Sequence, residues 1–268
     1  MQRSYLLSID FKVYSLTDWA VQLKLNPLFA ILCGFEFGDT PGVGTFYDFL
    51  NRLWDSDSDN LSSHEHLVKK KKINKPKQKG LKAESIESVS VEQLLKRLEN
   101  STFSIDDQPY ASLFHIYHQE FLCQSVQKGL IDTNSLAIAG DGTPFVTSAR
   151  ECKHRVCDCA NNGISDCDCN RYFSQPDCDI GWHSSRDCFY LGYDLYILVA
   201  SNSESDLSLF PLLNTASKHD SHGFLEAYFR MKSFLPDYHV NKWILDATHD
   251  AMPYYTYCRN HNIQPLLT

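Results

Sequence analysis

The sequence contains no apolar run long enough to cross a membrane. The longest run near the start, 28–33, is much shorter than the ~20 residues that a transmembrane helix needs, and it lacks the flanks of a signal peptide. We therefore expect a cytoplasmic protein with no membrane partner. Disulfide frameworks are rare in that compartment, so the ten cysteines become candidate metal ligands.

The chain also lacks an excess of basic residues. Its formal net charge is −8, which disfavours a nucleic-acid partner because phosphate contacts need lysine and arginine. One stretch departs from this average: residues 69–79 read KKKKINKPKQK, without an acid. Such a stretch is either a solvated surface linker or a contact to the DNA backbone. The candidate DNA-binding residues are Lys69, Lys70, Lys71, Lys72, Lys75, Lys77 and Lys79.

Two common signatures of enzyme active sites are missing as well. The glycine-rich turn at 38–45, GDTPGVGT, lacks the Lys-Ser/Thr ending of a nucleotide-binding loop, and no serine or cysteine nucleophile has a matched base. The chain does have apolar content, since 43% of its 268 residues are hydrophobic and 13% aromatic. That content is enough to bury a core, and we expect one or two folded domains.

The first half of the chain is expected to be mainly helical. Ser15 begins a capping-box-like sequence, SLTD, and Thr45 is placed to cap a second helix, FYDFLNRLW. After a polar, charge-rich stretch, Ser90 is placed to cap SVEQLLKRLE. A further helix is predicted from about 110 to 128, ending at Gly129.

The second half shows the pattern of strands mixed with helices. Strands are predicted at 135–141, at 189–200, where the odd-numbered apolar residues share one face, and at 209–216. After a helix, strands at 242–246 and 263–267 flank another helix, and such a β-α-β unit implies parallel strands. The expected divisions are a helical N-terminal region (1–54), a lysine-rich linker (55–89), a helical segment (90–130) and an α/β domain (131–268) with a cysteine-rich insertion (150–188).

Two aspartates stand where the predicted apolar strands end. Asp141 follows AIAG and Asp246 follows WIL, and ligands of open α/β sheets bind beyond the carboxyl ends of the strands. Two carboxylates brought together there repel each other unless a cation neutralises them, and hard oxygen ligands suit Mg²⁺. A divalent ion could then activate water for phosphodiester cleavage. The alternative is that each aspartate only caps the turn that follows it.

The cysteine block is a second candidate site. Cys157 and Cys159 form one CDC, Cys167 and Cys169 form another, and four thiolates can close a tetrahedral Zn²⁺ site. Closed coordination would organise the insertion without doing chemistry. The alternative is a set of reduced thiols that bind no metal.

Two His-Asp pairs resemble the ligands of metal phosphohydrolases. They are His219–Asp220 and His249–Asp250, and both follow predicted strands, whereas that class of enzyme carries its ligands on facing helices. We therefore expect Asp220 and Asp250 to cap the helices that follow them. His249 lies three residues after Asp246, so it is expected near the same site.

From about residue 35 onward, the cysteine block and five other segments follow one another in a characteristic order. The five segments are DTPGVGTFYDFLNRL, AIAGDGTPF, SQPDCDIGWHSSRDCFYLGYDLYIL, PLLNTASKHDSHGFLEAYF and ILDATHDAMPYYTYCRNHNIQPLL. In this order they resemble bacterial insertion-sequence transposases of the DDE superfamily. Such enzymes carry a ribonuclease-H-like catalytic domain behind a helical N-terminal region, and they use three carboxylates with Mg²⁺ or Mn²⁺ to cut and join DNA ends. The resemblance implies that Asp141 is the first carboxylate and Asp246 the second.

The resemblance also implies an incomplete catalytic set. The third carboxylate of the family is a Glu downstream of the second Asp, and no Glu follows Asp246 here. The implied partners are the element's terminal repeats and target DNA, with a homo-oligomer as the active form and a location at the nucleoid. The alternatives are a DNA-binding remnant that does not cut, and a nuclease of the same fold.

Overall fold

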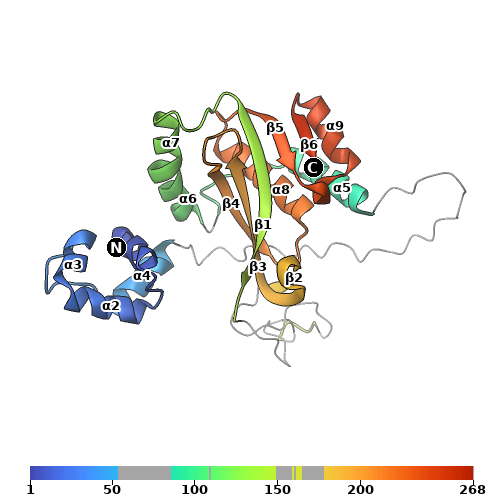
Figure 1. Ribbon diagram of the computed structural model, residues 1–268. Coiled ribbons are helices and arrows are strands. Elements are labelled where there is room, and N and C mark those ends of the chain that lie inside the picture. Colours follow the sequence, from blue (N-terminus) through green and yellow to red (C-terminus); the bar gives the residue numbers. More distant parts are fainter. Residues whose placement is uncertain (54–85, 109, 149–158, 160, 165–177, 268) are drawn as a thin grey trace, which may run out of the picture. The chain divides into compact units, whose positions relative to one another are not determined.

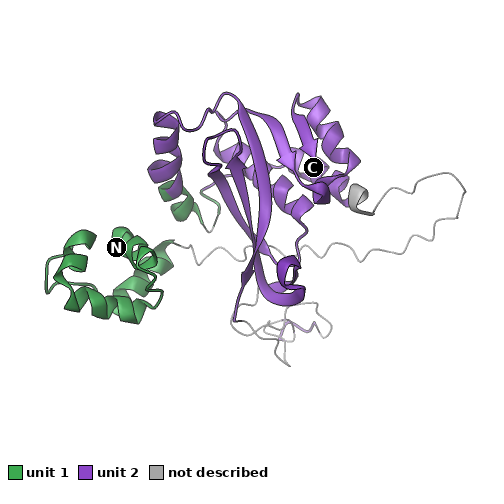
Figure 2. Ribbon diagram, in the orientation of Figure 1, with its two compact units in different colours: residues 1–58, 106–116 green, residues 59–105, 117–268 purple. Residues whose placement is uncertain are grey.

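The computed structural model describes residues 1–53, 86–108, 110–148, 159, 161–164 and 178–267. The chain divides into two compact units (Figure 2): unit 1 comprises 1–58 and 106–116, and unit 2 comprises 59–105 and 117–268. Within the described ranges, no helix has both the length and the apolar character that crossing a membrane requires.

The N-terminal part of unit 1 is helical, as predicted. Ser15 caps α2, and its Oγ accepts a hydrogen bond from the amide of Asp18 at 3.2 Å. The prediction that Thr45 caps α4 is wrong, because the Thr45 amide already bonds to the carbonyl of Gly42 at 3.1 Å and the helix begins two residues earlier. The helices are α1 (Gln2–Asp10), α2 (Leu16–Leu25), α3 (Pro27–Cys33) and α4 (Val43–Leu53).

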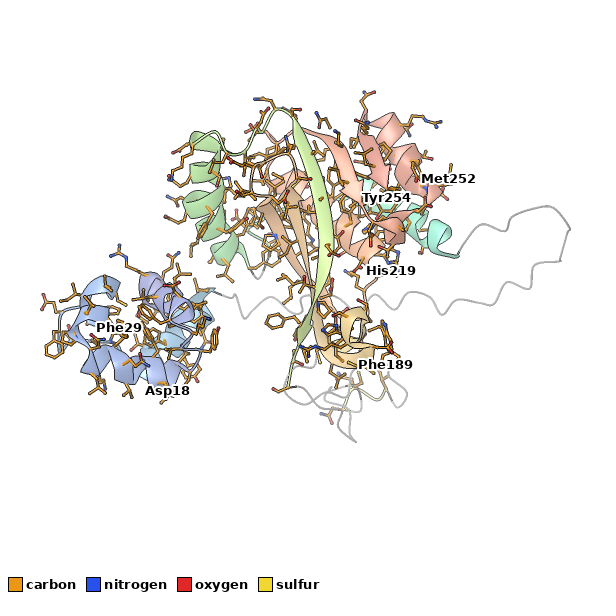
Figure 3. All side chains as sticks on the ribbon, viewed as in Figure 1. Asp18, Phe29, Phe189, His219, Met252 and Tyr254 are labelled. Carbon is orange, nitrogen blue, oxygen red and sulfur yellow. The ribbon has the colours of Figure 1, made fainter. Side chains whose placement is uncertain are left out.

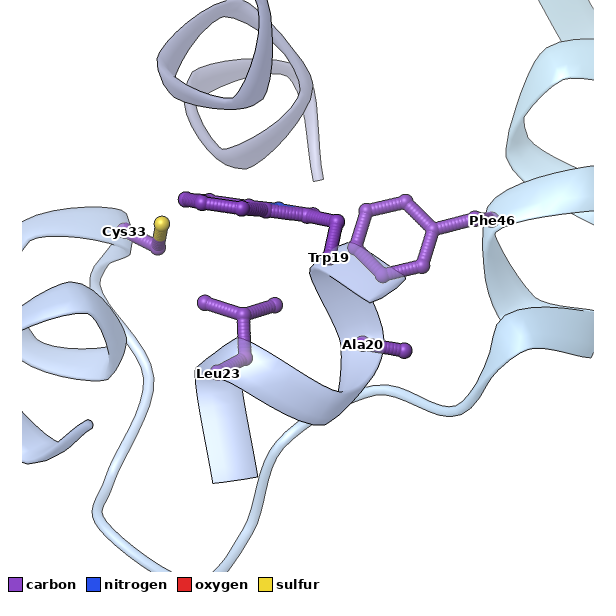
Figure 4. Packing of buried hydrophobic residues seen from close by; sticks show 5 residues of the cluster. All are labelled: Trp19, Ala20, Leu23, Cys33 and Phe46. Carbon is purple, nitrogen blue, oxygen red and sulfur yellow. The ribbon is translucent and has the colours of Figure 1, made fainter. Parts of the chain in front are cut away.

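These helices enclose a small aromatic core of their own, shown in Figure 4. It consists of Trp19, Ala20, Leu23, Cys33 and Phe46, all buried. The Trp19 indole N–H donates to the Oγ of Ser4 at 2.9 Å, which satisfies the ring's polar atom inside the core. The burial of this serine therefore follows from its role as the partner of Trp19.

The next helices start and end close to their predicted positions. α5 (Ile86–Glu99) begins four residues before Ser90, so the predicted cap is wrong; Ser90 lies inside the helix, and its Oγ is 3.2 Å from Nε2 of His222. The helix predicted at 110–128 is confirmed, and Gly129 follows it with a φ of +72°. It consists of α6 (Ala111–Tyr117), a π-helical turn (His118–Leu122) and α7 (Cys123–Gln127).

The centre of unit 2 is a mixed sheet, which confirms an α/β fold (Figure 1). In the described part of the chain it has six strands in the order β2-β3-β1-β5-β6, and β4 also pairs with β3. β3 runs antiparallel to β1, β2 and β4, whereas β5 runs parallel to both β1 and β6. The strands are β1 (Leu136–Val146), β2 (Asp179–His183), β3 (Cys188–Ala200), β4 (Leu207–Thr215), β5 (Val240–Leu245) and β6 (Gln264–Leu267).

Two strand boundaries correct the predictions. β1 continues to Val146 because its pairing with β3 extends to the Val146–Gly192 pair, so Asp141 lies inside a strand rather than at its end. β2 was not predicted, and it occupies the end of the expected cysteine-rich insertion. The strands predicted at 189–200, 209–216, 242–246 and 263–267 are confirmed as β3, β4, β5 and β6.

Helices α8 (Asp220–Phe234) and α9 (Met252–Asn260) pack against one face of this sheet, here called the inner face. Trp243 of β5 is fully buried there, with its ring centroid 4.9 Å from that of Phe224 on α8 and 5.3 Å from that of Tyr257 on α9. The even-numbered residues of β3, including Tyr196 and Leu198, face the same side and are buried. The opposite, outer face of β3 carries the odd-numbered apolar residues, most of which are only half-buried.

Candidate functional site

The structure places Asp141 on β1 and Asp246 directly after the end of the adjacent strand β5. β1 and β5 are parallel, and Ala139 pairs with Ile244. Asp141 and Asp246 each lie two residues beyond that pair, so they are neighbours across the two strands. The sequence predicted both acids at the ends of apolar strands; the structure places Asp246 directly after β5 and Asp141 inside β1.

Asp141 itself is exposed on the outer face. It pairs with Ile197, and side chains alternate along a strand, so it points away from Gly142, Asp194 and Tyr196. Its Oδ1 accepts a hydrogen bond from the amide of Gly142 at 2.9 Å. The carboxylate is thus accessible, and its charge still acts on buried acids behind the strand.

Asp246 is held firmly by the turn that follows β5. Its Oδ1 accepts hydrogen bonds from the Thr248 amide at 3.2 Å, from the Thr248 hydroxyl at 2.5 Å and from Nδ1 of His249 at 2.6 Å. Partial burial raises the pKa of Asp246, but these bonds outweigh burial and the net shift is downward. The carboxylate is therefore ionised at neutral pH. It also caps the turn that follows β5, which was the alternative interpretation of this residue.

His249 connects Asp246 to the core under the sheet. It is 1% exposed, and its Nε2 lies 3.1 Å from the hydroxyl of Tyr196. Burial is the largest of the effects that raise the pKa of Tyr196, so its hydroxyl keeps its proton and donates a hydrogen bond to Nε2. With Nε2 accepting from Tyr196, Nδ1 carries the hydrogen that faces Asp246, which gives an Asp–His–Tyr chain of hydrogen bonds.

Two further acids lie beside this site on the inner face, and sequence reasoning did not propose them as site residues. Asp194 on β3 is only 7% exposed; burial, and then the charges of Asp220 and Asp141, raise its pKa to about 7. The pKa of Asp220 is also raised, mainly by burial. His249 acts to lower it, and the charge of Asp141 acts to raise it. The available sequence signal was that Asp194 shares the even-numbered face of the predicted strand with Tyr190 and Tyr196.

Neither His-Asp pair caps a helix through its aspartate, so that prediction is wrong. His219 caps α8, with Nδ1 accepting from the Ser221 amide at 3.3 Å, and Asp220 is the first helical residue, with its carboxylate over Gly142. Asp250 instead accepts from the hydroxyl of Tyr255 at 2.9 Å, and α9 begins after Ala251 without a side-chain cap.

The two helices that border the inner face are joined next to these acids. The Tyr254 hydroxyl on α9 donates to the carbonyl of Ser221 in the first turn of α8. Figure 3 labels Tyr254 together with His219, the N-cap residue of α8. This link fixes the start of α8 and with it the position of Asp220.

The other predicted site residues fall largely outside the described residues. All seven lysines of 69–79 lie there, as do Cys157, Cys167 and Cys169. Cys159 is described and half-buried. Across the described ranges, no group of three or more His, Cys, Asp or Glu side chains has an arrangement that could hold a metal ion. The zinc site and the lysine contact to DNA stay predictions.

Comparisons of the chain with protein-family models, with curated proteins and with solved structures found no match. Its function is therefore inferred from the carboxylates themselves. Asp141 on β1 and Asp246 directly after β5 offer two hard oxygen donors, and Asp246 is ionised because its hydrogen bonds favour the charged form. This donor set suits Mg²⁺ or Mn²⁺ better than a soft metal ion.

Proposed function

We propose that this chain carries the metal-binding core of a DDE transposase, with Asp141 and Asp246 as its two retained Mg²⁺ or Mn²⁺ ligands. The observation that carries the proposal is the parallel register of β1 and β5, which makes these two aspartates neighbours. An ionised, oriented Asp246 beside an accessible Asp141 is the arrangement that such a metal site requires.

The sheet also supports a ribonuclease-H-like catalytic domain. The antiparallel strands β4, β3 and β1 continue into the parallel strands β5 and β6, with α8 before β5 and α9 between β5 and β6. Such a mixed sheet, behind a helical N-terminal region, is what the resemblance to insertion-sequence transposases implies. Asp141 then lies on the central strand β1, and Asp246 directly follows the adjacent parallel strand β5.

The chain's own residues would orient the reaction. A bound divalent ion supplies activation of the attacking hydroxyl and stabilisation of the leaving oxygen. Thr248 and His249 occupy Oδ1 of Asp246, so Oδ2 would be left free to hold the ion. Tyr196 holds His249 from below, which keeps that carboxylate from rotating. Asp141 supplies the second oxygen from the exposed side of β1.

The proposed partners are the terminal repeats of the element and target DNA. Lys69, Lys70, Lys71, Lys72, Lys75, Lys77 and Lys79 would contact the phosphate backbone, which would add affinity without sequence specificity. A zinc ion on Cys157, Cys159, Cys167 and Cys169 would organise the insertion. Pairing of two DNA ends would need a homo-oligomer, in the cytoplasm at the nucleoid.

The proposal is tested by cleavage of labelled DNA carrying the element's terminal repeats, in Mg²⁺, Mn²⁺ and EDTA. The chain, and any form extended by its downstream reading frame, is compared with Asp141→Asn and Asp246→Asn. Asp206→Asn serves as the matched control, because Asp206 lies in the exposed turn between β3 and β4. We expect metal-dependent cutting that both site variants reduce by at least ~100-fold and the control does not.

Two results would contradict the proposal. Cutting that survives both Asp141→Asn and Asp246→Asn would place the chemistry elsewhere. DNA binding without cutting in any form would favour the alternative, a transposase remnant that binds DNA and does no catalysis.

A further inference from the structure

Two carboxylates face each other on the inner side of β1, directly over Gly142. A β-carbon built on Gly142 would lie 2.7 Å from Oδ1 of Asp220, and 2.8 and 2.9 Å from the two carboxylate oxygens of Asp194. Asp194 comes from β3 and Asp220 from the first turn of α8. The missing side chain of Gly142 thus leaves a space lined by three carboxylate oxygens.

The more deeply buried of these acids has no compensating partner nearby. None of the described residues donates a hydrogen bond to the Asp194 carboxylate, which is 7% exposed. Lys218, close to the start of α8, is paired instead with Glu226 at 2.6 Å. Asp220 gains some stabilisation from the helix N-terminus and from His249 and His219, but Asp194 shares none of these three as a direct partner.

A buried amide beside the pair is also without a partner. Asn214 is the register partner of Asp194 across β3 and β4, and it is 3% exposed. In the part of the chain that the structure describes, its Nδ2 has no hydrogen-bond partner. That atom lies 3.4 Å from where a β-carbon on Gly223 would be, so the amide points under the first turn of α8, which carries Asp220.

Buried polar groups in folded proteins are normally paired, and two carboxylates that share a site either take up a proton or bind a cation. Carboxylate oxygens are the preferred ligands of hard divalent ions, and Mg²⁺ keeps several waters when the protein supplies only a few ligands. A buried amide can hydrogen-bond such a water or one of the carboxylates. The close pair of carboxylates over Gly142 and the unpartnered Asn214 amide together meet these requirements.

We propose that Asp194 and Asp220 form a divalent-cation site on the inner face, with Asn214 as its supporting polar group. The backbone of β1 at Gly142 separates this inner site from Asp141 on the outer face. The inference does not depend on the transposase proposal, since it concerns binding by different residues and requires no DNA.

The test is a Mn²⁺ titration of the whole chain followed by electron paramagnetic resonance, with circular dichroism as the check of folding. Mn²⁺ prefers oxygen ligands, so the cysteines compete weakly for it. Asp194→Asn and Asp220→Asn are compared with the double variant Asp141→Asn/Asp246→Asn and with the exposed control Asp206→Asn. Asp220 is half-buried, so its substitution keeps the test valid if the Asp194 variant does not fold.

We expect one Mn²⁺ ion to remain bound in the Asp141→Asn/Asp246→Asn double variant. Its dissociation constant should rise at least ~10-fold in Asp194→Asn and in Asp220→Asn, and should not change in Asp206→Asn. Loss of all Mn²⁺ binding in the double variant, or unchanged binding in the Asp194 and Asp220 variants, would overturn the inner site. DNA cleavage is read separately, so failure of the transposase proposal leaves this result intact.

Discussion

At the scale of single residues, the most informative side chain is His249, because it is buried and both of its ring nitrogens have hydrogen-bond partners. Its two ring nitrogens connect Asp246 to Tyr196, and its ring lies among aromatic neighbours, with centroids 5.8 Å from Phe224 and 5.9 Å from Tyr254. A buried hydrogen-bonded network of this kind is stabilising only while every member has its partner. The sequence places His249 near Asp246 but gives no sign of the Tyr196 contact, which arises from residues 53 positions apart.

This network predicts a measurable coupling between Tyr196 and His249. Tyr196→Phe should lower the free energy of unfolding by about 1–2 kcal/mol, because it leaves the buried Nε2 of His249 without a donor. His249→Phe keeps an aromatic ring but loses both bonds, and should cost about 2–4 kcal/mol. Urea unfolding of both single variants and the double variant should give a coupling of about 1 kcal/mol.

A matched control for this cycle is Tyr255→Phe. Its hydroxyl also bonds to an aspartate, Asp250, but at an exposed position. Its loss should change stability by less than about 0.5 kcal/mol. Strictly additive effects of Tyr196→Phe and His249→Phe would show that the two side chains do not interact.

At the scale of elements, the sequence predicted strands better than it predicted which face of a strand is buried. The alternation in 189–200 placed the odd-numbered apolar residues of β3 on one face and did not show which face is covered. In the structure the even-numbered residues pack under α8 and are more deeply buried, although Asp194 is among them. Hydrophobicity alone misreads a strand that buries an acid beside tyrosines, because the pairing partners and helices decide which face is covered.

Several bounds of helices and strands were mispredicted for a related physical reason. Ser90 and Thr45 have the chemistry of helix caps, but α5 and α4 begin before them and contain them, since a serine or threonine costs little within a helix. β1 runs past Asp141 because hydrogen bonds to β3 hold it, and those bonds are non-local. β2 is short and lies next to the cysteine-rich stretch, where no alternation marks it.

Gly142 gives a prediction for β1 as an element. Gly142→Ala places a methyl group against the carboxylates of Asp194 and Asp220, which have short side chains and little room to move. We expect it to lower the free energy of unfolding by about 1–3 kcal/mol, as overpacking of a filled site does. Urea unfolding in EDTA measures this cost without a contribution from bound metal.

The control for Gly142→Ala is Gly44→Ala in α4. A β-carbon on Gly44 meets nothing within 4 Å, so alanine should be neutral there or stabilise by up to about 1 kcal/mol. If both alanine variants behaved alike, the close approach of the two acids to Gly142 would not exist in solution.

At the scale of the whole molecule, composition and local pattern predicted an α/β protein with a helical beginning, and the structure agrees. They predicted that Asp141 and Asp246 lie near one another but not the register of β1 against β5, because parallel register depends on a crossover through other elements. The proposed function rests on the order of motifs in the chain and on this pairing together. The net charge of −8, taken over the whole chain, would have argued against DNA.

The division into two units predicts that they lose structure separately. Trp19 is fully buried in the core of unit 1, and Trp19→Ala should cost about 3–5 kcal/mol. A helical unit of this size is stable by only a few kcal/mol, on the order of 0.05–0.15 kcal/mol per residue, so the substitution should unfold it. Hydrogen exchange should then show α2 and α3 unprotected while the amides of β3 and β5 keep their protection.

Val21→Ala, at an exposed position of the same helix, should leave both units protected. Loss of protection in β3 and β5 together with α2 would instead mean that the two units fold as one cooperative body, in which case the core around Trp19 would also support the carboxylate site.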